Sequence, residues 1–317
     1  MKLVSVIMPV YNGESFISEA IKSILAQSYN NFELIIIDDF SKDNTIKIIE
    51  NYINKDRRIK YFINSNHKGI VGALNTGLEK SKGEYIARAD SDDINLKNRF
   101  LKQVEFLNHN KDFMLVGGGY AVFNENGKYI KIFHPSLPIE IAWNFVSNTF
   151  FAHPTVMFRK ELVYEFGLYP DEEAEDFAYF SSIVHKYKCA NLDTILVEYR
   201  EHNLNRSFVY SKEINKSVQN TFKKNFFYYT GSLDNTDIFF NYQRFKKVQF
   251  QNISKLILLN YCIINKILHD YNLSFISIQN IKFIIKLYIN IFIFPLTKLY
   301  AIIKNRIKQI ISDNNIK

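Results

Sequence analysis

With 317 residues, 47% of them apolar, the chain is long enough for one large domain or a catalytic domain with an appendage, and its composition excludes wholesale disorder. Its two cysteines, Cys189 and Cys262, lack metal-type spacing, which argues against a disulfide framework or a zinc site and fits a reducing cytoplasm. The net charge of +8 belongs to the tail, because residues 1–209 carry 24 Lys and Arg against 27 Asp and Glu, whereas residues 210–317 carry 16 against 5.

The N-terminal third alternates continuous apolar runs with amphipathic stretches. Strands are predicted at residues 4–10, 32–37 and 59–63, and helices at residues 17–25 and from Ser41 or Asp43 onward. Unbroken apolar strands that alternate with helices are typical of a parallel sheet covered on both faces. The apolar run of residues 3–10 is too short for a signal peptide and no small-residue cleavage site follows it, so we expect a cytoplasmic protein.

Two phosphate-binding motifs are missing from this pattern. Residues 9–13, Pro-Val-Tyr-Asn-Gly, stand where a dinucleotide enzyme has Gly-x-Gly-x-x-Gly, and no Gly-x-x-x-x-Gly-Lys-Ser/Thr occurs. Dinucleotide oxidoreductases and P-loop NTPases are therefore disfavoured. Residues 66–77 are rich in Gly and Asn, which either allow a ligand close to a helix start or form a helix entry without a ligand.

Three carboxylates, Asp90, Asp92 and Asp93, follow a short apolar strand predicted at residues 84–89. The carboxyl ends of strands are where open α/β sheets place their ligands. Neighbouring carboxylates repel one another, and a divalent cation held by carboxylates and by substrate phosphates would offset that repulsion. The alternative is a solvated acidic loop, or a helix N-cap in which Asp93 or Asn95 begins the next helix.

The elements beyond this acidic cluster are predicted from the same apolar patterns and turn signals. A helix is predicted around residues 100–107, a hairpin of strands at residues 114–123 and 129–133, and a further strand that ends near residue 158. His153 lies in the loop before that last strand. It either contacts a ligand or is a structural loop histidine held by Pro154.

A second acidic run, residues 171–176, precedes a helix predicted at residues 177–187. These carboxylates either serve chemistry or complement the dipole of the helix. Arg200 and His202 follow a strand predicted at residues 194–197. They are either partners of an anion or an ordinary surface pair.

Seven ordered motifs together resemble glycosyltransferase family 2. They are residues 4–12, 37–45, 75–77, 83–86 and 90–93, continued by Glu175-Asp176 and Tyr199-Arg200-Glu201-His202. The resemblance covers residues 1–208 and leaves residues 209–317 as a basic, largely helical C-terminal region. It implies an α/β GT-A fold, a nucleotide-binding sandwich with a mostly parallel central sheet, and metal-dependent, inverting transfer from a nucleotide sugar to an acceptor hydroxyl.

By this resemblance, five positions are assigned to the donor nucleotide. They are Pro9, Tyr11, Asp39, Asn75 and Asp90. Asp39 is expected to accept from the N–H of the base, and Asp90 to contact the ribose or a metal-bound water. Two residues depart from the family pattern, since Phe40 stands where the family usually has Gly and Leu74 where an Arg often precedes the Asn.

The reacting groups are assigned in the same way. Asp92 matches the last position of the family's Asp-x-Asp motif and is expected to bind Mn²⁺ or Mg²⁺ directly, and Asp176 matches the general base. Glu175, Arg200 and His202 are candidate phosphate or acceptor contacts. The residues suit the chemistry, because a metal offsets the charge of the departing diphosphate and a carboxylate takes the proton of the acceptor hydroxyl.

The tail, residues 210–317, carries a charge balance of +11. Its apolar stretch 281–303 is interrupted by lysines and by Pro295, so no membrane span is predicted. Four apolar residues after it share one face of a basic interfacial helix that suits an anionic membrane surface: Leu299, Ile303, Ile307 and Ile310. The alternatives are a helical subdomain packed on the catalytic domain, or a dimer interface that makes the protein a homodimer.

Three classes of function remain. The first is an inverting transferase that moves a sugar from a UDP-sugar to a saccharide or lipid-linked saccharide in bacterial surface polysaccharide or lipopolysaccharide assembly, at the inner face of the cytoplasmic membrane. The second is a non-catalytic nucleotide-sugar-binding scaffold or sensor, which the intact Asp39, Asp92 and Asp176 argue against. The third, a nucleic-acid-binding protein, is disfavoured because no recognised motif accompanies the basic tail.

Overall fold

The computed structural model describes residues 1–203, 205–245, 252–271, 280 and 282–287. Its internal contacts divide the chain into two units, Met1–Thr221 and Phe222–Lys317. The division falls inside helix α9 (Ser211–Thr230), so one helix belongs to both units.

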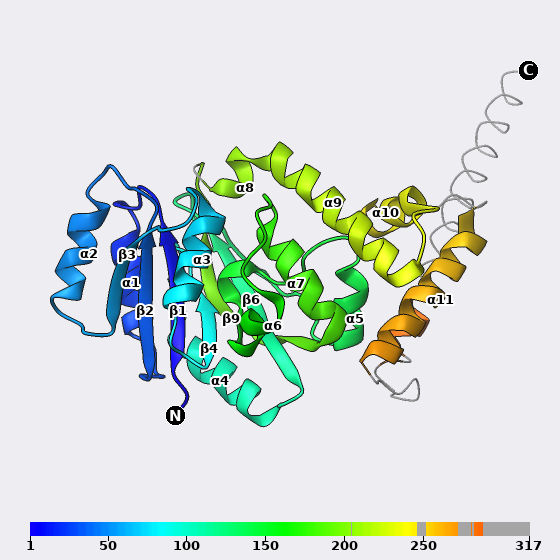
Figure 1. Cartoon of the computed structure of the whole chain (residues 1–317), viewed down its shortest axis with the longest axis horizontal. Helices are drawn as coiled ribbons and strands as arrows, with labels where there is room; N and C mark the ends of the chain where they lie inside the picture. Colours follow the sequence, from blue (N-terminus) through cyan, green and yellow to red (C-terminus); the bar gives the residue numbers. More distant parts are fainter. Residues whose placement is uncertain (204, 246–251, 272–279, 281, 288–317) are drawn as a thin grey trace, which may run out of the picture. The chain divides into compact units, whose positions relative to one another are not determined.

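The first unit begins with the predicted alternation of strands and helices (Figure 1). Its elements are β1 (Val4–Val10), α1 (Ile17–Leu25), β2 (Phe32–Asp38), α2 (Thr45–Ile53), β3 (Ile59–Ile63), α3 (Ile70–Lys80) and β4 (Tyr85–Arg88). The strands lie in the order β3-β2-β1-β4 and pair in parallel. The side chain of Asp43 accepts from the backbone N–H of Thr45 at 3.0 Å, so this aspartate satisfies one of the free donors at the start of α2.

The second half of this unit adds antiparallel strands to the sheet. Its elements are β5 (Ile94–Asn95), α4 (Arg99–His109), β6 (Phe113–Phe123), β7 (Tyr129–Ile132), α5 (Pro138–Asn144), the 3₁₀ turn η1 (His153–Thr155), β8 (Met157–Arg159), α6 (Glu161–Phe166), α7 (Glu175–Lys186) and β9 (Lys188–Arg200). Strand β8 enters antiparallel between β4 and β6, β9 pairs in parallel with β6, and β5 closes that edge. The predicted β6–β7 hairpin is confirmed.

The start of α4 differs from one of the sequence-based alternatives. Neither Asp93 nor Asn95 begins a helix, because Asn98 is the N-cap of α4 and Asn95 belongs to β5. Asp93 is instead buried, with 1% of its surface exposed. The third carboxylate of the cluster is therefore held inside the protein, where it orients the chain around the other two.

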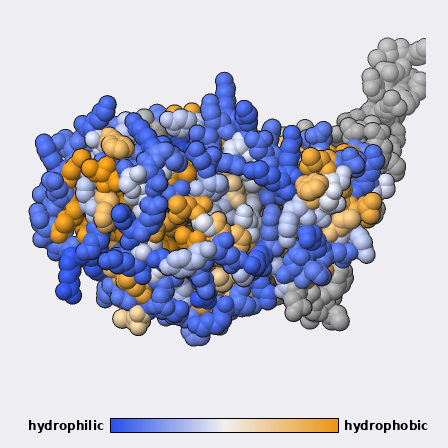
Figure 2. Space-filling model, viewed as in Figure 1, coloured by the Kyte–Doolittle hydropathy of each residue, from blue (hydrophilic) through white to orange (hydrophobic). Residues whose placement is uncertain are grey.

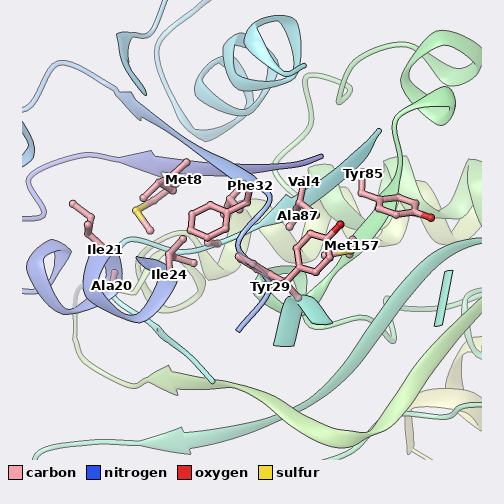
Figure 3. Close-up of a cluster of buried hydrophobic side chains, with 14 of the residues drawn as sticks. Val4, Met8, Ala20, Ile21, Ile24, Tyr29, Phe32, Tyr85, Ala87 and Met157 are labelled. Carbon is pink, nitrogen blue, oxygen red and sulfur yellow. The ribbon is translucent and has the colours of Figure 1, made fainter. Parts of the chain in front are cut away.

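Alternate residues of β1 point into different layers of the core. The first layer, shown in Figure 3, combines apolar residues of β1, α1, β2 and β4, among them Val4, Met8, Ile21, Ile24, Phe32 and Ala87. Each fully buried Val, Ile or Leu side chain contributes about 1.5–3 kcal/mol. On the other face, α3 lies so close to β1 that a Cβ on Gly77 would be 2.4 Å from Cγ2 of Ile7. A larger residue would push α3 away from the sheet.

The second unit is helical. It holds the end of α9 and the helices α10 (Thr236–Phe245) and α11 (Ile253–Asp270). The hydroxyl of Tyr228 donates to Asp270 at 2.8 Å, and the ammonium of Lys266 lies 3.3 Å from the same carboxylate, which ties α9 to α11. No helix among the residues that the structure describes is long and apolar enough to cross a bilayer. The predicted interfacial face beginning at Leu299 lies outside the described residues.

Candidate active site

The predicted nucleobase residues lie where β1 and β2 end. Pro9 belongs to β1, and Tyr11 follows it with 51% of its surface exposed. Asp39 follows β2 and is buried, and its carboxylate accepts from the amide of Asn64 at 2.8 Å and from the backbone N–H of Gly69 at 2.9 Å. The ammonium of Lys68 lies 5.5 Å from the ring centroid of Tyr11. The loop between β3 and α3 therefore brings Tyr11 and Asp39 to one place.

The turns after β1 and β2 are tied to each other. The backbone N–H of Asn12 donates to the hydroxyl of Ser41 at 2.9 Å, and the side-chain oxygen of Asn12 accepts from the backbone of Lys42 at 2.8 Å. Phe40 adopts a left-handed backbone with φ of 65°, a conformation that costs a residue with a side chain about 1–2 kcal/mol. The chain thus keeps the turn that a glycine would adopt without strain, and leaves the ring of Phe40 half exposed.

Asn75 has a structural partner. Its side-chain amide donates to the carbonyl of Tyr169 at 3.0 Å, and its side-chain oxygen accepts from the backbone N–H of the same residue at 2.8 Å. Asn75 therefore fastens the loop that precedes α7 to helix α3. Its contact with a donor nucleotide stays a prediction.

The first acidic cluster places Asp92 against a histidine. The carboxylate of Asp92 lies 2.9 Å from Nε2 of His202, and Asp90 is ion-paired with Arg88. Burial, together with the neighbouring charge of Asp90, raises the pKa of Asp92, although the contact with His202 opposes this rise. Asp93 accepts from the backbone N–H of Arg200 at 2.9 Å, and among the described residues its second oxygen has no hydrogen-bond partner.

Arg200 and His202 have different surroundings, although the sequence treats them alike. The guanidinium of Arg200 donates to the carbonyl of Asp92 at 3.0 Å and lies over the rings of Phe16 and Phe123, at 4.8 and 4.6 Å from their centroids. The ring of His202 stacks on Phe16 at 5.0 Å and turns its Nε2 toward Asp92. Arg200 thus fixes the backbone of the acidic cluster, whereas His202 faces the side-chain carboxylate of Asp92.

A hollow of 610 Å³ borders this pair. It is lined by His202, Arg200, Phe16 and Phe208, and by the β6–β7 turn at residues 124–126. Neither Asp39 nor the acidic pair at the start of α7 lines it. The hollow therefore borders His202, and neither Asp92 nor the predicted nucleobase residues line it.

The site can be tested for its fit to a divalent metal. Among the described residues no group of three or more His, Cys, Asp and Glu side chains is arranged to hold an ion. Asp92 and His202 could supply two ligands, and the second oxygen of Asp93 is an acceptor without a hydrogen-bond partner among the described residues of the same cluster. Two protein ligands fit a cation that takes its remaining ligands from substrate phosphates and water.

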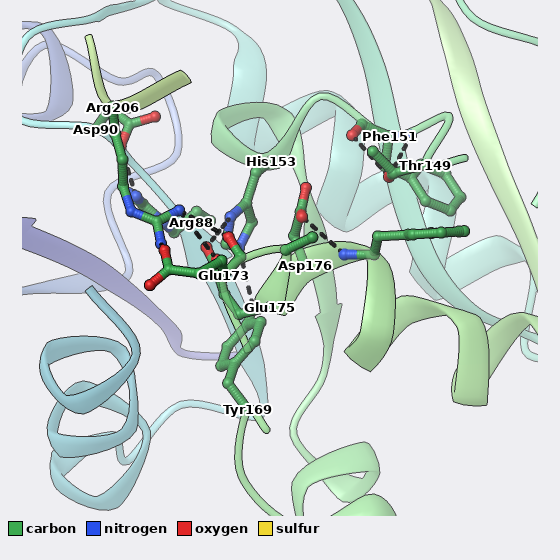
Figure 4. Close-up of polar contacts among 12 residues, drawn as sticks. Arg88, Asp90, Thr149, Phe151, His153, Tyr169, Glu173, Glu175, Asp176 and Arg206 are labelled. Atoms are coloured by element: carbon green, nitrogen blue, oxygen red, sulfur yellow. Dashed lines mark hydrogen bonds and ion pairs between the residues drawn. The ribbon is translucent and has the colours of Figure 1, made fainter. Parts of the chain in front are cut away.

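A second acidic pair, Glu175 and Asp176, begins helix α7 (Figure 4). One oxygen of Asp176 accepts from the backbone N–H of Phe177 at 2.7 Å, as a residue at a helix start commonly does. Burial raises the pKa of Asp176, and that hydrogen bond and Arg206 oppose the rise. Burial and the adjacent Asp176 raise the pKa of Glu175 to about 8. Both carboxylates lie in the first turn of α7, where they also complement the dipole of the helix, so their catalytic role stays a prediction.

His153 lies beside the acidic pair, in the turn η1. Its Nδ1 is 3.6 Å from Glu175, and its Nε2 is 3.1 Å from the hydroxyl of Tyr169. Burial, with help from the positive charges of Arg88 and Arg206, lowers the pKa of His153 well below its usual value. The imidazole is therefore neutral at pH 7.

Two arginines of the site were missed by the sequence analysis. Arg88 is buried in β4 and Arg206 lies at the start of α8 (Arg206–Val209), where its guanidinium contacts Glu173 and lies 3.4 Å from Glu175. Arg88 has a signal in the sequence, since it is the single charge in an apolar strand directly before the acidic cluster. Arg206 has none, because it reaches the site only through the path of the chain after His202.

Comparisons with known proteins identify the same family that the sequence motifs resemble. The family described as Glycosyl transferase family 2 matches residues 5–167. An uncharacterized glycosyltransferase of Haemophilus influenzae is 38% identical over 188 residues, covering 59% of this chain and 74% of that protein. The Escherichia coli protein named UDP-Glc:alpha-D-GlcNAc-diphosphoundecaprenol beta-1,3-glucosyltransferase WfgD is 37% identical over 206 residues, covering 62% of this chain and 77% of that one.

Solved structures agree on the fold. Staphylococcus aureus TarS, residues 1–349 in complex with UDP-GlcNAc, superposes with a TM-score of 0.59 at 20% identity, over 86% of this chain and 84% of that one. The mannosyltransferase PcManGT of Pyrobaculum calidifontis, in complex with GDP-Man and Mn²⁺, gives a TM-score of 0.51 at 16% identity, over 86% and 88%.

The fold is thus that of the GT-A glycosyltransferases, as the sequence predicts. The chain belongs to glycosyltransferase family 2 and is a glycosyltransferase. The family match ends at residue 167, before Glu175, Asp176 and His202. The roles of those three residues therefore depend on the geometry given above.

Proposed function

We propose that the protein is a metal-dependent, inverting glycosyltransferase that moves a sugar from a UDP-sugar to a hydroxyl of a saccharide acceptor. The observation that carries this proposal is the pairing of two different acidic sites on one sheet. Asp92 faces an imidazole and suits a metal with a diphosphate, whereas Asp176 is half-buried at a helix start and suits a base. A scaffold that only binds nucleotide sugars would need the first site but not the second.

The donor would lie across the ends of β1 and β2. Tyr11 offers an exposed ring for the nucleobase, and Asp39 offers a fixed carboxylate that can accept from the N–H of uracil. Both lie against the same loop, so donor binding would order Tyr11 and Lys68 together. Asp90 then lies between the nucleoside and the metal, where it would contact the ribose or a metal-bound water.

Asp92 and His202 would hold the metal that carries the donor diphosphate. The metal offsets the negative charge that grows on the leaving nucleoside diphosphate. Mg²⁺ prefers oxygen ligands, while imidazole suits first-row transition ions, so a carboxylate and imidazole pair favours Mn²⁺ over Mg²⁺. Arg200 contributes indirectly, since it fixes the carbonyl of Asp92 and the backbone near Asp93.

Asp176 would act as the general base. As the acceptor oxygen bonds to the anomeric carbon, the bond to the diphosphate breaks on the opposite face of the sugar, and the hydroxyl proton passes to Asp176. Burial raises the pKa of Asp176, which strengthens its carboxylate as a base. One direct displacement of this kind inverts the anomeric centre.

The acceptor is proposed to be a saccharide of surface polysaccharide or lipopolysaccharide assembly, carried on a lipid. The name of the related WfgD includes a lipid-linked diphosphate acceptor. Exposed apolar residues of the second unit suit docking on the inner face of the cytoplasmic membrane: Phe227, Leu233, Leu258, Tyr261 and Ile285. Figure 2 shows orange hydrophobic residues reaching the surface there. A contact between two copies of the chain is the other use of such residues.

The test is to incubate the purified protein with Mn²⁺ and a panel of UDP-glucose, UDP-galactose, UDP-GlcNAc and GDP-mannose, and to measure release of the nucleoside diphosphate. We expect turnover of a UDP-sugar that stops when a chelator is added. Binding of a nucleotide sugar without any release, in the presence of saccharide acceptors, would instead identify a scaffold or sensor.

A further inference from the structure

We propose that Glu175 and the neighbouring His153 together hold a single proton, which resides on Glu175 and leaves Asp176 as the only anion of the acidic pair. His153 is thus a positioning residue that acts on the base through Glu175. The inference rests on the proposed role of Asp176 in deprotonating the acceptor. It assigns a function to a buried histidine that touches neither the predicted donor residues nor the metal ligands.

The geometry confines Glu175 between two partners. Its side chain is 6% exposed, with Oε1 at 3.6 Å from Nδ1 of His153 and Oε2 at 3.4 Å from Nη1 of Arg206. His153 is backed in turn by the hydroxyl of Tyr169, at 3.1 Å from Nε2. Tyr169 is itself fixed, because its backbone is bonded to Asn75 and its ring packs on Tyr179 at 4.5 Å between centroids. The contacts of Arg206 with Glu175 and of Asn75 and Tyr179 with Tyr169 therefore hold both ends of the row Glu175–His153–Tyr169, whose three side chains are drawn in Figure 4.

A count of the charges around this row requires one proton. Arg88, from β4, is already paired with Asp90, and Arg206, from α8, is already paired with Glu173. Arg206 also lies 3.4 Å from Glu175, so the two arginines face four carboxylates, those of Asp90, Glu173, Glu175 and Asp176. If Glu175 and Asp176 were both ionised, the negative charges would outnumber the positive ones at a place where Glu175 is buried. Like charges in such a site do not both ionise, so one carboxyl keeps a proton.

The surroundings decide where that proton resides. On His153 it would place an imidazolium near two arginines, whereas on Glu175 it leaves every group of the row neutral. The protonated Glu175 then faces Nδ1 at 3.6 Å without a charge, and Nε2–H can donate to the oxygen of Tyr169 at 3.1 Å. The directions of the pKa shifts agree, because burial and Asp176 raise that of Glu175 to about 8 and burial lowers that of His153. Asp176 is also held in the anionic form by the N–H of Phe177.

The consequence for the reaction is a base of fixed charge. Below pH 8 the row is neutral, and Asp176 alone is free to take the acceptor proton. As pH rises through the pKa of Glu175, a second buried negative charge forms beside Asp176. The row Glu175–His153–Tyr169 is then no longer neutral and no longer positions Asp176. Activity should therefore fall at alkaline pH, and it should do so because of Glu175.

Infrared spectroscopy tests the inference without any substrate. We compare the wild-type protein with Glu175→Gln, which keeps the size and neutrality of a protonated glutamate, and with the control Glu173→Gln, which alters an exposed carboxylate on the same arginine. At pH 6.5 the wild-type minus Glu175→Gln difference should contain the C=O stretch of one protonated carboxyl group, and the control difference should not. The band should vanish with an apparent pKa near 8. No such band at pH 6.5 overturns the proposal.

Thermal unfolding gives a second readout that needs no activity. A carboxyl whose pKa is higher in the folded than in the unfolded state stabilises the fold least at high pH. Wild type should therefore lose stability relative to Glu175→Gln between the ordinary glutamate pKa of 4.5 and about 8, with no further change above. A constant difference across that range contradicts the proposal.

The catalytic arm separates this inference from the proposed function. Glu175→Gln should lose the alkaline decline of kcat. His153→Phe should lower kcat and shift the alkaline limb, because the imidazole beside Glu175 is removed, while KM for the donor stays unchanged. An unaltered alkaline limb in both variants contradicts the inference. If the infrared band is present but Asp176→Asn retains full turnover, the base lies elsewhere and the proposed function of Asp176 is what fails.

Discussion

Replacing Asp92 with Asn removes the charge that would hold the metal and changes little else. The amide has the size of the carboxylate, and its oxygen can still accept from His202, 2.9 Å away from the present carboxylate. The contact from Arg200 is made to the backbone carbonyl of Asp92, so it survives the substitution. We therefore expect the variant to fold as the wild type does and to lose activity for an electrostatic reason.

The size of that loss follows from the charge removed. Losing one preorganised electrostatic stabiliser of a developing anion commonly lowers kcat by about 10²–10³, or about 2.7–4 kcal/mol. Asp92 is the carboxylate that faces His202, since Asp90 is paired with Arg88 and Asp93 is buried on the backbone of Arg200. No neighbouring carboxylate is positioned to replace it. Asp92→Asn should therefore lower turnover of the donor at least a hundredfold.

The assay is release of nucleoside diphosphate from the UDP-sugar, measured while Mn²⁺ is titrated. Asp171→Asn is the matched control, because that carboxylate is 84% exposed and pairs only loosely with His67 at 3.7 Å. The control should behave as wild type. The reasoning is refuted if Asp92→Asn regains full turnover in saturating Mn²⁺, or if excess chelator leaves the wild type fully active.

Three further predictions concern other parts of the chain. His202→Phe keeps the stack on Phe16 but should raise the Mn²⁺ concentration for half-maximal turnover by about 10–100-fold, and an unchanged titration would remove His202 from the metal. Phe40→Gly should resist urea better than Phe40→Ala by about 1 kcal/mol, because both lose the ring but only Gly relieves the φ of 65°; equal stabilities would contradict the strain. Sedimentation with anionic vesicles should be lost in high salt and weakened in protein truncated after residue 290, at about 1 kcal/mol for each basic side chain that no longer engages the surface. Equal recovery with neutral vesicles would rule out membrane docking.

The parallel half of the fold could be predicted from the sequence because its strands are continuous apolar runs. Residues 4–10, 32–37 and 59–63 are nearly the observed β1, β2 and β3, and the carboxylates that follow them were placed at strand ends correctly. The antiparallel insertion of β8 between β4 and β6 could not be derived in this way. Its pairing partners lie far from it in sequence, and a three-residue strand has too little pattern to fix its neighbours.

The residues of the site likewise fall into those that the sequence could predict and those that it could not. Asp39 and Asp92 could be singled out because each follows an apolar strand within a recognisable motif. The grouping of Glu175 with His153 and Arg206 could not, because these residues come from three separate elements and meet only through tertiary packing. For Arg200 the motif indicates a phosphate contact, which stays a prediction, but it does not indicate that the guanidinium holds the carbonyl of Asp92 between two aromatic rings.

The central claim is that Asp176 removes the acceptor proton while the donor is held elsewhere. The most direct measurement compares Asp176→Asn with wild type in two assays, turnover of the UDP-sugar and affinity for UDP in the presence of Mn²⁺. The account predicts that turnover is lost and that affinity for UDP stays near the wild-type value, because a base contributes only in the transition state. A parallel loss of UDP affinity and turnover would contradict it, and would make Asp176 a binding residue.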